Sequence, residues 1–202
     1  IIQVKEQLIG AGREIKPRPV LFVDALQTAM RQRNIPEKTL KVKIDPAAAY
    51  VIADSTQLVR ALGNILQNAV EAGAKFVTVS AHPTEERGVL EIDIEDDGAG
   101  MSDEVMHKAW SPFFTTSGVG HHGLGLPATM HVISQSQGRI ALVSEAGKGT
   151  TVAMFMPNGN SNDKAVDADS TTRSMYSRST NSKGKRSGFP APLRYQEWHS
   201  LY

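Results

Sequence analysis

An alternating run that ends in a glycine turn is the feature that most constrains this chain. Residues 89–95 read Val-Leu-Glu-Ile-Asp-Ile-Glu, and Asp-Asp-Gly-Ala-Gly follows at 96–100. Alternation of apolar and acidic side chains is typical of a strand with one buried face, and Asp-Gly is a frequent turn signal. The pattern therefore predicts a half-buried strand with the carboxylate of Asp96 at its end.

Apolar spacing elsewhere predicts a mixed α/β domain. We expect helices over 20–32, from the N-cap Asp54 to about Gly73, and over 123–137 with Gly138 as C-cap. The middle helix should place six apolar residues on its core side: Leu58, Leu62, Ile65, Leu66, Ala69 and Val70. Further strands are expected at 40–44, 50–53, 76–79, 139–144 and 150–155, the last two as a hairpin. Residues 111–122 lack periodicity and are expected to form a mobile loop.

Composition excludes several classes of function. The chain of 202 residues suits one domain plus an appendage, and its net charge of +1 predicts no nucleic-acid or membrane partner. It has no cysteine, which excludes disulfides, thiolate metal sites and cysteine nucleophiles. No apolar run reaches the roughly 18 residues that a membrane-spanning helix needs. From Asn158 onward the sequence is rich in Ser, Thr, Asn and basic residues, which is typical of a flexible tail or linker.

Two asparagines in the middle helix are candidate metal ligands. Asn64 and Asn68 lie one turn apart and share a helix face. Amide oxygens suit a Mg²⁺ ion that is otherwise held by waters and phosphates. The same pair would also suit an ordinary solvated helix face, since amides often serve that purpose.

Two glycine motifs suggest contact with a purine nucleotide. Asp96 could accept a hydrogen bond from the exocyclic amine of adenine, and Gly98 would let the backbone approach the ring. Gly-Leu-Gly-Leu at 123–126 opens a helix, whose backbone N–H groups could bind phosphates. A tight turn in the first case and a hinge in the second are the plain structural alternatives.

The segment between these motifs is a candidate lid. Phe113 and Phe114 fit no core register, so the loop could close over a ligand or cover a small hydrophobic cluster. The adjacent His121 and His122 have no carboxylate or cysteine partner at ligand spacing. They do not predict a metal site, because structural zinc needs four ligands.

In this order, the motifs resemble those of the ATP-binding catalytic domain of sensor histidine kinases. That domain belongs to the larger group that includes DNA gyrase B, Hsp90 and MutL. The matching segments are Asn64–Glu71 (N box), Asp96–Met101 (G1 box), Pro112–Thr116 (F box), Gly123–Leu126 (G2 box) and the glycine motif Ser144–Thr150. The resemblance covers roughly 17–157 and is greatest to the nitrogen-regulator-like kinases.

The resemblance implies a two-layer α/β sandwich: a mixed, mostly antiparallel sheet with helices on one face and a flexible ATP lid. The implied ligands are ATP and Mg²⁺. Asp96 would bind the adenine amine, while Asn68 would hold Mg²⁺ with help from Asn64, and these two asparagines are the candidate catalytic residues. The other implied nucleotide contacts are Gly100 and Thr150 beside adenine, Gly123 and Gly125 at the phosphates, and Ala72, Gly98, Met101, Phe114, Thr115, Thr116, His122, Leu124 and Leu126.

The chain departs from the family pattern at several places. Ser117 stands where many relatives have lysine, His121-His122 replaces Gly-Thr, and Pro127 stands where alanine is common. Relatives that hydrolyse ATP have a glutamate four residues before the Mg²⁺ asparagine, where this chain has Asn64. A neutral amide is a poor general base, so we expect slow hydrolysis and transfer to a side chain instead.

The resemblance also implies what lies outside the domain. Residues 1–16 would end a preceding helical dimerisation segment, 17–157 would form the ATP-binding domain, and 158–202 would be the tail or linker. None of the six histidines has the His-Glu context of the family's phosphoacceptor, so the acceptor is expected outside this chain. The implied partners are the acceptor domain of the same protein, a response-regulator receiver domain and a second copy forming a homodimer. The implied location is the cytoplasm, including as the cytoplasmic part of a membrane-anchored sensor.

Three functions remain open at this point. The first is transfer of the γ-phosphate of Mg-ATP to a histidine in a two-component phosphorelay. The second is an ATP-dependent conformational switch or ATPase, since Asn64 argues against turnover but not against switching. The third is a degenerate pseudokinase that acts as a partner surface, for which Ser117 is the best support.

Overall fold

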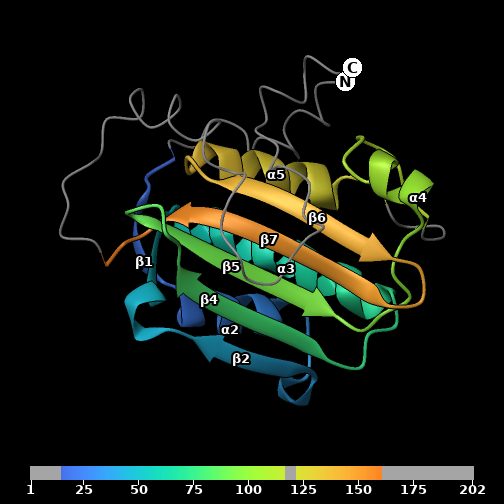
Figure 1. Cartoon of the computed structure of the whole chain (residues 1–202), viewed down its shortest axis with the longest axis horizontal. Helices are drawn as coiled ribbons and strands as arrows, with labels where there is room; N and C mark the ends of the chain where they lie inside the picture. The colour runs from blue at the N-terminus through green and yellow to red at the C-terminus, as the bar shows by residue number, and fades with distance from the viewer. Residues whose placement is uncertain (1–14, 117–121, 161–202) are drawn as a thin grey trace.

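A five-stranded sheet covered on one face by helices forms the body of the molecule (Figure 1). The computed structural model describes residues 15–116 and 122–160. The strands are β1 (Arg18–Leu21), β2 (Leu40–Ile44), β3 (Tyr50–Ala53), β4 (Val77–Pro83), β5 (Val89–Asp96), β6 (Arg139–Glu145) and β7 (Gly149–Pro157). The helices are α2 (Phe22–Gln32), α3 (Ser55–Glu71), α4 (Asp103–Lys108) and α5 (Gly125–Gln135), with short 3₁₀ turns at Glu37–Thr39 and Pro46–Ala48.

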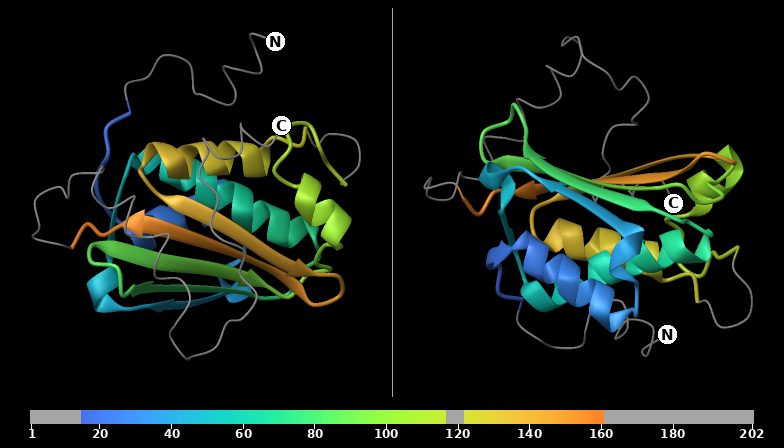
Figure 2. Two further views of the ribbon diagram at one scale, coloured as in Figure 1. Left: turned by 45° about the horizontal axis from the view of Figure 1, so that its top comes forward. Right: turned by 90° about the horizontal axis from the view of Figure 1, so that it is seen from below.

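The large sheet has the order β2-β4-β5-β7-β6 and is mixed. Only the β2–β4 pair is parallel, and the other three pairs are antiparallel. Helices α2, α3 and α5 lie on the same side of the sheet (Figure 2). This arrangement confirms the predicted two-layer α/β sandwich with a mostly antiparallel sheet.

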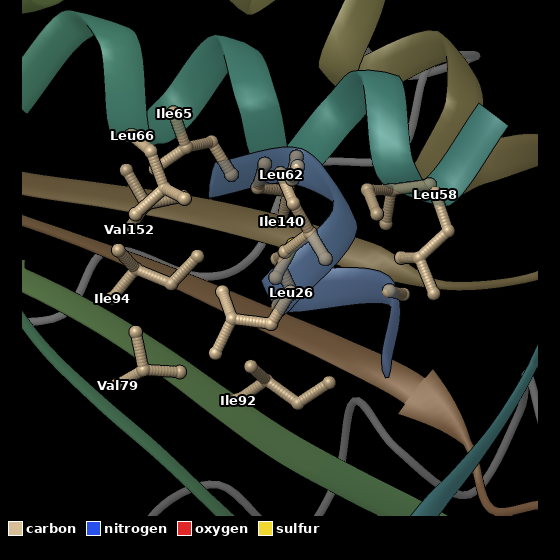
Figure 3. Packing of buried hydrophobic residues seen from close by; sticks show 14 of the residues in the cluster. Leu26, Leu58, Leu62, Ile65, Leu66, Val79, Ile92, Ile94, Ile140 and Val152 are labelled. Atoms are coloured by element: carbon tan, nitrogen blue, oxygen red, sulfur yellow. The ribbon is translucent and has the colours of Figure 1, made fainter. Parts of the chain in front are cut away.

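The core lies between that helical layer and the sheet. Alternate residues of β5 face the helices, as the sequence pattern predicts, and Ile92 and Ile94 are almost fully buried. Leu62 and Leu66 of α3 meet them from the other layer (Figure 3). Val70, which we expected on the core side of the same helix, is 41% exposed. That expectation was wrong because Val70 lies beyond the edge of the buried stripe, on the solvent side of the last helical turn.

The first helix begins later than the sequence suggested. Arg18–Leu21 pairs with Tyr50–Ala53 in a separate two-stranded antiparallel sheet, so the expected helix over 20–32 begins at Phe22. The helical spacing did not reveal this pairing, because its partner strand lies about 30 residues away in sequence. The remaining strands agree with prediction to within about two residues, except that β4, expected over 76–79, extends to Pro83.

Helix boundaries follow local capping chemistry. The Asp54 side chain accepts hydrogen bonds from the N–H groups of Thr56 and Gln57, which confirms it as the N-cap of α3. At the end of α5 it is Gln137, and not Gly138, that adopts a positive φ of 58°. Gly138 is needed for another reason, because a Cβ there would lie 2.7 Å from Sδ of Met156.

Several expectations concern residues outside the described ranges. They include the helical segment expected at 1–16 up to residue 14, Ser117, His121 and the tail beyond residue 160. At the expected boundary, Asn158 donates its side-chain amide to the carbonyl of Ala47 and forms a β-bridge with Val51. Nowhere in the described part of the chain does a helix combine the length and apolar character needed to cross a membrane.

Candidate functional site

A cleft of about 890 Å³ opens between α3, the start of α5 and one end of the sheet. Its volume lies within the roughly 300–1,000 Å³ typical of small-molecule sites. Every site residue predicted from sequence lines this cleft except Gly98. Segments that are far apart in sequence therefore converge on one place, as the set of motifs predicted.

Asp96 lies at the sheet end of the cleft. The register of β5 and β7 pairs it with Thr150. Its Oδ1 accepts the N–H of Gly98 at 2.9 Å, and both this bond and the nearby backbone of Thr150 act to lower the pKa of the carboxyl. Burial nevertheless raises the pKa of the Asp96 carboxyl above its ordinary value, with a smaller contribution from the neighbouring acids Asp97 and Glu95. The result is a fixed, partly desolvated hydrogen-bond acceptor.

Two glycines let the backbone close tightly around Asp96. Gly100 has a φ of +63°, and a Cβ there would lie 2.0 Å from the carbonyl oxygen of Glu145. Gly149 has a φ of +104°, and its Cβ would lie 1.9 Å from the carbonyl oxygen of Asp96. The glycine turn and the β6–β7 hairpin are therefore in direct backbone contact.

Gly98 supports the site from behind the cleft wall. A Cβ at this position would lie 2.9 Å from the side chain of Ala72 in the α3 C-cap and 2.9 Å from Oδ1 of Asp96. The next residue, Ala99, donates its N–H to the carbonyl of Ala72 at 2.9 Å. Gly98 therefore holds the turn against α3, which explains why it does not line the cleft.

A pair of hydroxyl groups joins the hairpin to the glycine turn. The Oγ of Ser144 lies 2.9 Å from Oγ1 of Thr150 and donates to the carbonyl of Gly149. It also accepts the N–H of Met101 at 2.8 Å. Ser144, which the sequence assigned only to the last glycine motif, thus fixes Thr150 beside Asp96.

The two asparagines of α3 have different surroundings. Asn64 is already engaged: its Oδ1 accepts from Nη2 of Arg33 at 2.8 Å and its Nδ2 donates to the carbonyl of Gly125 at 3.2 Å. Asn68 is exposed and lines the cleft, and its side chain makes no hydrogen bond within the described residues. Asn68 is therefore the better placed of the two to offer an amide oxygen to a ligand.

The start of α5 forms the opposite wall. The helix begins at Gly125, two residues after the expected Gly123. Gly123 has a φ of +62°, and a Cβ there would lie 2.4 Å from the carbonyl oxygen of Phe114. Pro127 has no N–H, so the N–H groups that the first turn can offer to an anion come from Gly125 and Leu126.

The loop residues Phe114, Thr115, Thr116 and His122 also line the cleft. The base of the loop is closed by a hydrogen bond of 3.0 Å from the N–H of Phe113 to the carbonyl of Gly123. The flexibility of the lid stays a prediction, because residues 117–121 lie outside the described ranges.

Sequence reasoning did not assign three further charged side chains to the cleft. Arg33, Arg60 and Glu71 all line it, and Gln67 donates to the Glu71 carboxylate at 2.9 Å. Arg60 could have been found, because it lies one helical turn before Asn64. Arg33 comes from α2, and no local pattern connects it with the motifs.

The donor set fits a magnesium ion held mainly by phosphates and water. The described residues contain no group of three or more His, Cys, Asp or Glu side chains that could hold a metal by themselves. The exposed amide of Asn68 instead offers one neutral oxygen, which suits Mg²⁺ only when a ligand supplies the rest of the shell.

Comparison with known proteins identifies the family. Residues 53–160, more than half of the chain, match the family model described as histidine kinase-, DNA gyrase B-, and HSP90-like ATPase. The chain is 31% identical over 136 residues to the sensor protein FixL of Bradyrhizobium diazoefficiens, an alignment covering 65% of this chain and 26% of FixL. It is 28% identical over 137 residues to the sensor histidine kinase ZraS of Escherichia coli, covering 68% of this chain and 29% of ZraS. The chain thus spans less than a third of either relative.

Solved structures of sensor histidine kinases have the same fold as this chain. The mycobacterial sensor histidine kinase MprB superposes with a TM-score of 0.58 at 25% identity, covering 72% of this chain and 98% of that one. Full-length ShkA in complex with AMPPNP superposes with a TM-score of 0.61 at 23% identity, covering 83% of this chain and 35% of that one, which supports the fold alone. The chain belongs to the histidine kinase-, DNA gyrase B- and HSP90-like ATPase family and carries the ATP-binding catalytic domain of a sensor histidine kinase.

Proposed function

We propose that this domain transfers the γ-phosphate of Mg-ATP to a histidine in a segment outside the chain. The observation that carries the proposal is the polarity of the cleft. A desolvated carboxylate, Asp96, lies at one end, and an exposed amide, Asn68, lies about one helical turn further along α3 from Ala72. The first end suits an adenine amine, and the second suits a phosphate-bound cation.

Each residue then has a physical role. Asp96 accepts the adenine amine, and Thr150 stays beside it through the hydrogen bond to Ser144. The N–H groups of Gly125 and Leu126 bind phosphate oxygens at the start of α5. Asn68 holds Mg²⁺, which when bound neutralises charge on the transferred phosphoryl group. Catalysis consists of positioning and electrostatics, as in other phosphoryl transfers.

The surroundings of Asn64 support transfer over hydrolysis. Its oxygen accepts from Arg33 and its nitrogen donates to Gly125, so its amide is fixed on both sides. An amide in that position cannot take a proton from water at neutral pH. Free phosphate should therefore form slowly in comparison with label on the acceptor.

Partners and organisation are proposals of the same kind. We infer that the acceptor histidine lies in a preceding dimerisation segment ending at 1–16, that 17–157 is the catalytic unit, and that 158–202 is a tail or linker. A receiver domain would take the phosphate in a two-component phosphorelay in the cytoplasm. Membership of the nitrogen-regulator-like subgroup is supported by Pro-Phe-Phe-Thr-Thr at 112–116 and by Asn-Ala-Val-Glu-Ala-Gly at 68–73.

Radiolabelled γ-phosphate ATP tests the proposal. The chain is mixed with Mg²⁺ and with the segment that precedes it in the parent protein, alongside Asp96→Asn and Asn68→Ala. We expect acid-labile, alkali-stable label on that segment, lost in both variants. Release of free phosphate without protein label would refute histidine transfer in favour of an ATPase switch. Failure to bind nucleotide would leave a degenerate partner module.

A further inference from the structure

The polar end of the cleft carries two arginines that the family motifs do not include. Arg60, Asn64, Asn68 and Ala72 follow one another at intervals of four along α3, and all line the cleft. With a helical rise of about 1.5 Å per residue, Asn64 lies roughly 12 Å and Arg60 roughly 18 Å from Ala72 along the axis. Positive charge is thus concentrated beyond Asn68, away from the adenine end.

Arg33 reaches this end from a different helix. It is the C-cap of α2, and its Nη2 donates to Oδ1 of Asn64 at 2.8 Å. Asn64 in turn donates to the carbonyl of Gly125, the first residue of α5. A single hydrogen-bonded chain therefore connects α2, α3 and the helix start that we assign to the phosphates.

Gly63 explains how the side chain of Arg33 packs against α3. Glycine is unfavourable in a helix interior, yet Gly63 lies in the middle of this one. A Cβ built there would lie 3.0 Å from Nε and 3.4 Å from Cγ of Arg33. The missing side chain leaves room for the stem of Arg33, so its guanidinium is held at the cleft.

Asn64 also leaves the charge of Arg33 uncompensated. A glutamate at position 64 would form an ion pair with the guanidinium and cancel its charge, whereas the amide accepts one hydrogen bond and stays neutral. No acidic side chain in the described part of the chain pairs with Arg33. A guanidinium carries five N–H donors in a rigid fork, and among residues 15–116 and 122–160 only Asn64 offers Arg33 a side-chain acceptor.

We propose that Arg33 is a nucleotide-binding residue that contacts the terminal phosphate, with Asn64 as the anchor that aims its guanidinium. The inference rests on the proposed function, because it places the triphosphate along α3 toward Asn64. It also gives the amide at position 64 a purpose other than activating water.

Competition binding against a fluorescent ATP analogue tests this on the full chain. ATP, ADP and AMP are compared for wild type, Arg33→Ala and Arg33→Lys. Arg31→Ala is the matched control, because Arg31 lies on the same helix, is exposed and does not line the cleft. We expect Arg33→Ala to lower the affinity for ATP about tenfold or more, as for a lost charge-assisted hydrogen bond. The affinity for ADP should fall less and the affinity for AMP should not change. Arg33→Lys should recover part of the lost ATP affinity.

Two further variants test the anchor. Asn64→Glu should lower the affinity for ATP as much as Arg33→Ala does, because the new carboxylate neutralises the guanidinium. Gly63→Ala should lower the affinity for ATP and leave the affinity for AMP unchanged, because the new methyl group displaces the stem of Arg33. Asn64→Ala and Arg33→Ala should show non-additive losses when combined, since they share one contact.

Several results would overturn the inference. Equal losses for ATP, ADP and AMP would mean a structural role, and unchanged affinities together with unchanged labelling of the acceptor would mean no role. Unchanged affinities with reduced labelling of the acceptor would mean that Arg33 contacts the acceptor instead of the nucleotide. If the wild-type chain binds no ATP, the proposed function is overturned as well. If the wild-type chain binds ATP and Arg33→Ala binds it as well as Arg31→Ala does, this inference alone is overturned.

Discussion

Two glycines in the β6–β7 hairpin give a sharp test of how the backbone builds the site. Gly147 and Gly149 both have positive φ, of +80° and +104°. Alanine at either position should cost about 1–2 kcal/mol for the left-handed backbone. Only at Gly149 does the new Cβ meet an obstacle, the carbonyl oxygen of Asp96 at 1.9 Å, while Gly147 has nothing within 4 Å.

The size of the additional effect follows from the geometry. Ordinary van der Waals contact begins at 3.4 Å, so β5 and β7 would have to separate by the difference between 3.4 and 1.9 Å, about 1.5 Å. This shift would disrupt the β5–β7 ladder where Asp96 pairs with Thr150 and would weaken the hydrogen bond from Ser144 to the Gly149 carbonyl. At about 1 kcal/mol for each hydrogen bond, Gly149→Ala should cost roughly 3–4 kcal/mol in total.

Urea unfolding and nucleotide competition measure the two consequences. Gly147→Ala should lose about 1–2 kcal/mol of the free energy of unfolding and bind ATP like wild type. Gly149→Ala should lose more stability and also lose ATP affinity, because Thr150 moves away from Asp96. If the two variants lose the same stability and bind ATP equally well, the close approach of Gly149 to Asp96 does not contribute beyond the φ angle, and the reasoning is refuted.

Three further predictions concern stability. Leu62→Ala should lower the free energy of unfolding by about 2–5 kcal/mol, because it leaves a cavity in the core. Val70→Ala, at a 41% exposed position, should lower it by less than about 0.5 kcal/mol. Urea unfolding measures both losses, and similar values for the two variants would contradict the core assignment. Asp54→Ala should lose about 1 kcal/mol with the N-cap, with unchanged ATP affinity by competition binding; a larger loss together with weaker ATP binding would mean that α3 itself had moved. Burial raises the pKa of Asp96 above 3.8, so the folded chain keeps that proton to higher pH, and the resulting stabilisation is present below 3.8 and lost as pH rises through the folded-state pKa. Relative to Asp96→Asn, wild type should therefore gain melting temperature as pH falls from 7 toward 4, and the opposite slope in thermal scans would contradict the raised pKa.

Sequence reasoning recovered the parts of the fold whose signals are local. Helix α3 has a side-chain cap and a long apolar period, and the β6–β7 hairpin has alternation around Gly147. The short helix α4 escaped because its six residues contain no buried position, and only the hydroxyl of Ser102 caps it. Strand β1 escaped because its pairing is tertiary.

The same division applies to the site. Motif residues such as Asp96 and Asn68 line one cleft, because glycine turns and helical spacing determine their positions locally, while their contacts with a nucleotide stay predictions. The position of Arg33 at the cleft could not be predicted, since it depends on the arginine side chain packing against Gly63 of α3. The burial that raises the pKa of Asp96 likewise depends on strands and a helix brought together only in the fold.

The hydrogen bond between Phe113 and Gly123 has a consequence for how this domain can vary. It joins the two ends of the intervening segment at 3.0 Å, so the body of the domain already fixes both ends of that loop. In such a loop the closure entropy grows only with the logarithm of its length, and doubling the number of residues costs about 0.6 kcal/mol. Insertions between these two points should leave the cleft wall and the sheet unchanged. The segment between Phe113 and Gly123 can therefore lengthen or shorten during evolution almost independently of the fold that holds its two ends.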